Sequence, residues 1–220
     1  PSMQKNYPFD PLTALAGVAM ISETYLALAV RSDSPIHSVN DVIRLAKEKP
    51  LTFGSSGVGS AHQIAGALLN AKAGISLSHV PFQGGGPAMQ ALAGGHIDMS
   101  FASLPSLVPL VKAGQLRMIA LAEPKRYAGY PDLPTINETL PGVETTSWVG
   151  MFAPAGTPKD ILEKVSKAVT AALQTKDVQE KMVALGMVPR PQGPAEFDRT
   201  IAESLKFWSE AVALAKIEKQ

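Results

Sequence analysis

The 220-residue chain has no cysteine, few aromatic residues and little charge. The lack of cysteine excludes disulfide bonds, thiolate metal ligands and cysteine nucleophiles, and it fits either a reducing or an oxidising compartment. Charged residues make up 18% of the chain and the formal net charge is +1. This balance disfavours both intrinsic disorder and nucleic-acid binding, so we expect no nucleic-acid partner.

Long apolar runs are also missing. No run approaches the roughly 18 residues that begin to indicate a membrane-spanning helix. The chain opens with Pro1 instead of methionine and shows no signal-peptide pattern, so we expect Pro1 not to be the first translated residue. Hydrophobic residues still make up 45% of the chain, enough to form the core of one large domain or two small ones.

Strand-like and helix-like segments alternate along the chain. We expect strands at 25–30, 51–54, 77–82, 97–103, 116–122 and 146–154. We expect helices at 38–47, 60–72, 87–93, 104–112, 158–173, 176–185 and 194–215, the last two separated by an irregular segment at 187–191. Such alternation predicts an α/β fold with mostly parallel, doubly wound sheets.

The segment from Leu51 to His62 is the most informative. A short apolar strand leads through a loop of serines and glycines into an amphipathic helix. The first N–H groups of a helix have no intrahelical acceptor and lie at its positive end, so this order is typical of an anion site. Ser55, Ser56 and Ser60 add hydroxyl donors. A tight strand-to-helix connection with Ser60 as the N-cap remains an alternative.

Two further strand ends carry small residues. They are the segments 83–86 and 102–103, and with the loop 54–59 they make three strand ends of this kind. Ligands bind beyond the carboxyl ends of the strands in doubly wound sheets, so three such ends on one edge predict a pocket.

Enzyme and metal sites are disfavoured. The loop 54–62 matches neither the phosphate-binding loop, the dinucleotide fingerprint nor the serine-hydrolase elbow. The four histidines have no metal-ligand spacing, and no paired carboxylates suit acid–base catalysis. We therefore predict no metal, no cofactor and no catalytic residue, and we expect Asp98 to be satisfied by a nearby backbone N–H.

Several motifs occur in an order that is typical of one family. They are Gly54-Ser-Ser-Gly-Val-Gly-Ser, Val80-Pro-Phe-Gln-Gly-Gly-Gly-Pro-Ala-Met, Gly94-Gly-His-Ile-Asp-Met, Leu104-Pro-Ser, Lys112-Ala-Gly-Gln-Leu-Arg and Ser147-Trp-Val-Gly-Met-Phe-Ala-Pro-Ala-Gly-Thr-Pro. Over essentially its whole length the chain resembles the extracytoplasmic solute receptors of tripartite tricarboxylate transporters, the TctC-like or Bug family.

The resemblance implies a fold and a function. The fold would be the two-lobed Venus flytrap of type II periplasmic binding proteins. The chain would capture a small carboxylate in the periplasm and deliver it to the membrane permease subunits of the transporter. Residues 24–147 would form the second lobe, and residues 1–23 and 148–220 the remainder of a first lobe whose N-terminal part is missing.

The resemblance also implies the ligand-binding residues. The carboxylate loop would comprise Ser55, Ser56, Gly57, Gly59, Ser60 and His62. A neighbouring wall would comprise Gly84, Gly85 and Gly86, and the side that selects the ligand Ala102 and Ser103. Phe82 and Trp148 would close the floor or the hinge side.

Two departures from the family pattern affect the interpretation. The first-lobe loop that completes the carboxylate clamp is absent, which would leave apolar helix faces and open sheet edges uncovered. We therefore expect association of chains, as in a homodimer, or weak ligand affinity. Many members of the family carry an acid or amide at the position where this chain has Ala102. A neutral wall disfavours an amino-acid ligand, whose ammonium needs a partner, and favours a mono- or dicarboxylate.

Two other functions remain open from the sequence. A ligand-sensing effector domain of a transcription regulator shares the flytrap topology. An α/β enzyme is the third possibility, although no nucleophile–base pair supports it.

Overall fold

The computed structural model describes residues 2, 7–145, 147–215 and 217, and the chain divides into two compact units. Unit 1 comprises Pro1–Thr24, Ser147–Ala213 and Ile217–Gln220, and unit 2 comprises Tyr25–Thr146 and Leu214–Lys216. The assignment of these units to a second lobe and an incomplete first lobe stays a prediction. Within the described ranges, no helix has the length and apolar character needed to cross a membrane.

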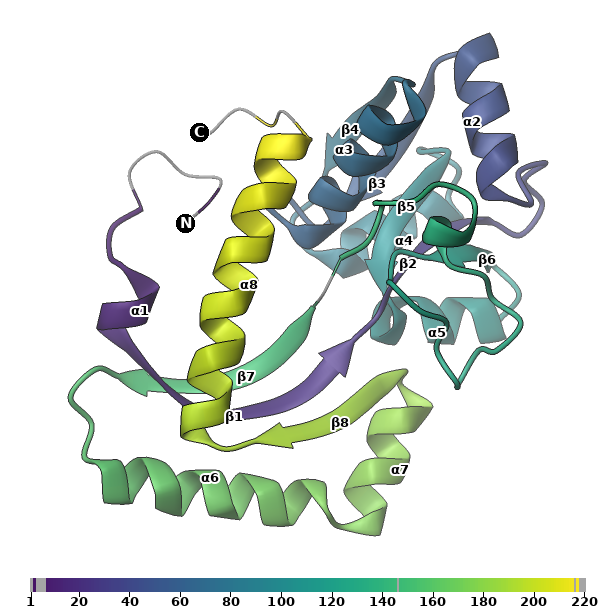
Figure 1. Ribbon diagram of the computed structural model, residues 1–220. Helices are drawn as coiled ribbons and strands as arrows, with labels where there is room; N and C mark the ends of the chain where they lie inside the picture. The colour runs from purple at the N-terminus through teal and green to yellow at the C-terminus, as the bar shows by residue number, and fades with distance from the viewer. Residues whose placement is uncertain (1, 3–6, 146, 216, 218–220) are drawn as a thin grey trace. The chain divides into compact units, whose positions relative to one another are not determined.

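Unit 2 is built on a five-stranded sheet of order β4-β3-β5-β2-β6 (Figure 1). Its strands are β2 (Leu26–Arg31), β3 (Leu51–Ser55), β4 (Leu77–Pro81), β5 (Met99–Ser103) and β6 (Leu116–Leu121). Its helices are α2 (Val39–Glu48), α3 (Ala61–Ala73), α4 (Gly85–Ala93), α5 (Leu104–Lys112) and the short 3₁₀ helix η1 (Ile136–Glu138).

The expectation of mostly parallel sheets is wrong. In unit 2, β3 pairs in parallel with β4 and β5, but β2 lies between β5 and β6 and runs antiparallel to both. The strands that helices α3, α4 and α5 connect, β3 to β6, all run in one direction, as crossover helices require. Strand β2 follows β1 with only Tyr25 between them, so no crossover helix fixes its direction.

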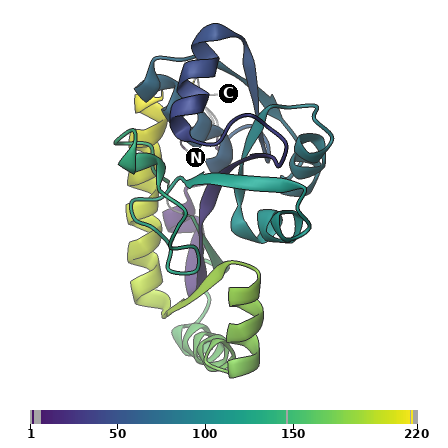
Figure 2. The same ribbon diagram turned by 90° about the vertical axis from the view of Figure 1, so that its right-hand side faces the viewer.

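Unit 1 contains a wholly antiparallel three-stranded sheet of order β7-β1-β8. Its strands are β1 (Leu15–Thr24), β7 (Trp148–Pro154) and β8 (Met187–Gln192). Its helices are α1 (Pro11–Ala14), α6 (Lys159–Leu173), α7 (Lys176–Ala184) and α8 (Pro194–Leu214). In Figures 1 and 2, α6 and α7 follow one another beside the sheet, and α8 begins at the end of β8 and crosses the strands.

Strands β1 and β8 were not predicted. The middle of β1 is buried on both faces, so it lacks the alternation of polar and apolar residues that marks a half-exposed strand. Strand β8 contains Pro189 and Pro191, which led us to expect an irregular segment. It is an edge strand that, among the described residues, pairs only with β1, and edge strands tolerate proline because the missing N–H would face outward.

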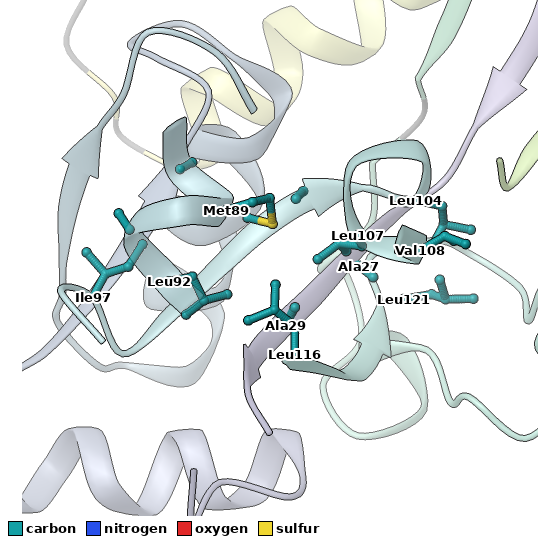
Figure 3. Packing of buried hydrophobic residues seen from close by; sticks show 13 residues of the cluster. Ala27, Ala29, Met89, Leu92, Ile97, Leu104, Leu107, Val108, Leu116 and Leu121 are labelled. Carbon is teal, nitrogen blue, oxygen red and sulfur yellow. The ribbon is translucent and has the colours of Figure 1, made fainter. Parts of the chain in front are cut away.

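The core of unit 2 lies on both faces of its sheet. Ala27 and Ala29 of β2 face a buried cluster that α4 and α5 complete (Figure 3). The cluster also contains Met89, Leu92, Leu104 and Leu107. On the opposite face, Phe53 packs edge-on against Phe101 with ring centroids 6.2 Å apart.

Helix α3 packs on that opposite face, with Gly66 directly against the Phe53 ring. A Cβ atom on Gly66 would lie 2.2 Å from the Phe53 ring, so only glycine allows α3 to approach β3 this closely. The helix that follows the serine–glycine loop is therefore fixed directly on the strand that precedes it.

Candidate functional site

Three helices begin at one edge of the unit 2 sheet. Strands β4, β3 and β5 are neighbours and run in the same direction, so their carboxyl ends share an edge. Helix α3 starts six residues after β3 ends, α4 four residues after β4 and α5 directly after β5. The three N-termini, with their positive dipole ends, are thus brought to the edge where the sequence predicted a pocket.

The N-terminus of α4 offers backbone donors. Its N-cap, Gly84, has φ +107°, and the structure as described gives this helix no side-chain cap. Pro87 has no N–H, so the first turn presents the N–H groups of Gly85 and Gly86 without intrahelical acceptors. The Gly84 N–H donates to the carbonyl of Ser56 at 3.1 Å, which ties this helix start to the serine–glycine loop.

The N-terminus of α5 contributes one donor and one hydroxyl. Leu104 N–H donates to the carbonyl of Tyr25 at 2.9 Å, and Pro105 has no N–H, which leaves the N–H of Ser106. The Ser106 hydroxyl lies beside α4, because a Cβ on Gly85 would be 3.1 Å from it. Ser106 was not among the residues predicted for the site, although the Leu104-Pro-Ser motif contains it.

The N-terminus of α3 is capped by the protein itself. The Ser60 hydroxyl accepts from the N–H of Gln63 at 3.2 Å and donates to the carbonyl of Gly57 at 2.7 Å. The side-chain oxygen of Gln63 in turn accepts from the N–H of Gly59 at 2.7 Å. The N-cap interpretation of Ser60 is confirmed, and its hydroxyl proton is engaged inside the loop.

Ser55 is directed into the protein. Its side chain is fully buried, and its hydroxyl accepts from the N–H of Gly57 at 3.2 Å and lies 2.6 Å from Nε2 of His79. Gly57 and Gly59 have φ values of +132° and +81°, which residues with a Cβ rarely adopt. Ser55 and the two glycines therefore shape the loop, and a contact of Ser55 with a ligand stays a prediction.

His62 joins two strand ends. Its Nδ1 lies 2.6 Å from the hydroxyl of Ser56, after β3, and its Nε2 lies 3.2 Å from the hydroxyl of Ser103, at the end of β5. Burial lowers the pKa of His62 to about 4, so the ring is neutral near pH 7. The structure thus brings together Ser56, His62 and Ser103, three residues that the family resemblance assigned to the ligand site.

Three further predicted residues pack against apolar or aromatic neighbours. Phe82 is half-buried and packs against the cluster shown in Figure 3. Ala102 is fully buried in that cluster. Trp148 belongs to unit 1, where its ring packs edge-on against Phe197 and its Nε1 donates to the hydroxyl of Ser204 at 2.7 Å. For these three residues a ligand contact stays a prediction.

The described residues show no cluster of three or more histidine, aspartate or glutamate side chains that could hold a metal ion. Asp98 accepts from the N–H and the hydroxyl of Thr52, both at 2.8 Å, as expected for a carboxylate satisfied within the protein. The donors at the sheet edge are thus backbone N–H groups and hydroxyls, a set suited to a carboxylate.

The lowered pKa of His62 predicts a pH-dependent stability. The unfolded residue binds a proton near pH 6.5, whereas the folded one resists it until about pH 4. Protonation therefore favours the unfolded state, and the free energy of unfolding should fall between these two pH values, by up to about 3 kcal/mol. Burial also lowers the pKa of His79, so protonation of His79 adds to this loss of stability.

The measurement is urea unfolding at a series of pH values. The variant His62→Gln should remove much of the slope, and replacement of the exposed His96 by glutamine should keep it. Equal slopes in the wild-type chain and His62→Gln would contradict the burial of an uncharged ring.

The family model for the tripartite tricarboxylate transporter family receptor, TctC, matches residues 1–215. A UPF0065 protein from the gbd 5′ region of Cupriavidus necator is 33% identical, over 90% of this chain and 61% of that protein. Another from the tcbD–tcbE region of Pseudomonas sp. strain P51 is 35% identical, over 73% of this chain and 49% of that protein. The chain thus spans about half to three-fifths of the length of these relatives.

Several solved structures are also similar to this chain. R. palustris Rpa4515 with adipate has a TM-score of 0.93 at 30% identity, covering 98% of this chain and 73% of that one. MatC from Rhodopseudomonas palustris with bound malate has a TM-score of 0.88 at 30% identity, over 96% and 74%. The periplasmic binding protein BugD has a TM-score of 0.92 at 28% identity, over 100% and 75%. The fold class expected from sequence, that of flytrap-like periplasmic binding proteins, is confirmed, and the chain belongs to the TctC receptor family of tripartite tricarboxylate transporters.

Proposed function

We propose that this chain is a solute receptor that binds a small carboxylate at the carboxyl edge of β4, β3 and β5. One observation carries the proposal: α4 and α5 begin at this edge with backbone N–H groups that no described side chain caps. Such N–H groups, at the positive ends of two helix dipoles, are a suitable site for a carboxylate. The neighbouring structures that hold adipate and malate support this ligand class.

We favour a mono- or dicarboxylate over an amino acid. Ala102, expected from the sequence to form a neutral wall, is buried in the core cluster, and its contact with a ligand stays a prediction. The preference rests instead on the donors of Gly85, Gly86 and Ser106, because an ammonium group would need acceptors.

The family also supports the setting and the partners. We propose that the chain acts in the periplasm, binds without catalysis and delivers its ligand to the permease subunits of a tripartite tricarboxylate transporter. An effector domain of a regulator has the same fold class, but the matching family is one of receptors.

We also propose self-association through strand β7 of unit 1. Among the described residues β7 pairs on one side only, and Val149, Met151 and Phe152 are exposed on it. Sedimentation analysis tests this proposal. A dimer at micromolar concentration is expected, and a monomer throughout would contradict it.

A thermal-shift screen tests the binding function. The chain is mixed with acetate, malate, adipate and aspartate, with inorganic phosphate as an anion of different shape. A ligand that binds the native state raises the unfolding midpoint, and a concentration of 100 Kd adds about 2.7 kcal/mol of stability. We expect a shift with malate or adipate. No shift with any carboxylate at millimolar concentration would contradict the receptor function.

A further inference from the structure

His62 is held between hydroxyls from two different strand ends. Its Nδ1 lies 2.6 Å from Ser56 Oγ, and its Nε2 lies 3.2 Å from Ser103 Oγ. A neutral imidazole has one N–H and one lone pair, so the ring accepts from one serine and donates to the other. The two serine hydroxyls therefore have different roles: one donates its proton to the ring, and the other accepts a proton from the ring.

The two distances indicate the direction of each hydrogen bond. Bonds donated by hydroxyl groups are shorter than bonds donated by N–H groups, which are commonest near 2.9–3.0 Å and extend to about 3.2 Å. The bond of 2.6 Å to Nδ1 fits the Ser56 hydroxyl as donor, and that of 3.2 Å fits Nε2–H donating to Ser103. This assignment places the ring proton on Nε2.

We propose that His62 is a positioning residue that engages the Ser56 proton and leaves the Ser103 proton free to donate to a bound carboxylate. The inference rests on the proposed function, because the carboxylate is its ligand. Ser103 stands at the N-cap position of α5, and within the described structure its side chain does not cap that helix. Its hydroxyl is therefore available to the ring on one side and to a ligand on the other.

Burial supports this arrangement. Because burial lowers the pKa of His62 to about 4, the ring keeps one donor and one acceptor at neutral pH. A ligand then meets a hydroxyl donor at Ser103, beside the N–H of Ser106 on the same helix start. Two hydrogen-bond donors at this position favour a ligand group that accepts hydrogen bonds, and they disfavour an ammonium group there.

The first experiment needs no ligand. In the chain labelled with ¹⁵N-histidine, long-range proton–nitrogen NMR spectra distinguish the two neutral tautomers of each ring, and His62→Gln identifies the signal of His62. We expect the Nε2–H tautomer in the wild-type chain and a mixture of tautomers in Ser56→Ala. An Nδ1–H tautomer in the wild-type chain, or an unchanged spectrum in Ser56→Ala, would overturn the proposal.

The second experiment measures adipate and malate binding by calorimetry. A hydrogen bond to a charged group predicts about tenfold or greater weakening in Ser103→Ala. Ser56→Ala should lose less, and Ser76→Ala, at an exposed position of unit 2, should bind like the wild-type chain. A larger loss in Ser56→Ala than in Ser103→Ala would overturn the donor assignment. If the wild-type chain bound neither acid, the proposed function and the donor role would fail together, while the NMR result would still decide the tautomer.

Discussion

Replacement of Gly86 by aspartate is expected to weaken the binding of malate or adipate by about 100-fold without loss of stability. Gly86 is exposed in the first turn of α4, and a Cβ there meets no atom within 4 Å. An aspartate carboxylate in a first turn interacts favourably with the helix dipole, by about 0.3–1 kcal/mol. The same carboxylate would repel a carboxylate ligand at the same N–H groups, and the expected 100-fold loss corresponds to about 2.7 kcal/mol.

The two readouts are calorimetric affinity and the urea midpoint of unfolding. Gly86→Asn tests the effect of size without charge and should lose much less affinity. Gln90→Glu adds the same charge to an exposed position further along α4, away from its N-terminus, and should bind nearly as the wild-type chain does. If Gly86→Asp bound malate and adipate with wild-type affinity, the ligand would not lie at the start of α4.

Replacement of Gly66 by alanine is expected to destabilise unit 2 by about 2–3 kcal/mol. The new Cβ would lie 2.2 Å from the ring of Phe53, which is itself 1% exposed. The ring has little room to move, because it stacks on His79 with centroids 5.0 Å apart and meets Phe101 edge-on. The strain therefore exceeds the gain in helix propensity of about 1 kcal/mol that alanine brings.

The matched control makes the same change where space is open. Gly86→Ala meets no atom within 4 Å and should leave the urea midpoint unchanged or raise it. If Gly66→Ala were as stable as the wild-type chain, α3 would not be packed on β3 as described, and the position of the loop between them would lose its support.

Local sequence patterns predicted most elements of unit 2. The apolar run that became β2, the helical pattern that became α2 and the serine–glycine loop before α3 each carry strong local signals, and the structure has the corresponding elements. Strand direction carries no such signal. The antiparallel placement of β2 depends on pairing with β5 and β6, which are distant in sequence.

Strands β1 and β8 were missed for a related reason. The sequence of β1 shows no alternation because its middle is buried on both faces, and the prolines of β8 are tolerated only because that strand lies at a sheet edge. The burial of β1 and the edge position of β8 both arise only when the sheet of unit 1 is assembled, so local sequence does not reveal them.

The sequence predicted which loops form the candidate site, but it did not predict the direction in which each side chain points. The glycine start of α4 was identified from residue types at a strand end, whereas Ser56, His62 and Ser103 were assigned to the site through the family resemblance, and their grouping around the ring was not predicted. Ser55 and Ala102 follow the same logic, yet the alternation of side chains along a strand directs both into the protein. Ser106 was missed because a serine in the first turn of a helix gives no signal of what lies beside it.

The most direct test of the central claim is an amide-resolved NMR titration of the ¹⁵N-labelled chain with malate and adipate. The account predicts saturable shifts that are largest for the N–H groups of Gly85, Gly86 and Ser106, the donors at the starts of α4 and α5. Saturable binding with its largest shifts away from these helix starts, or no shifts with either acid, would contradict a carboxylate site at this edge of the sheet.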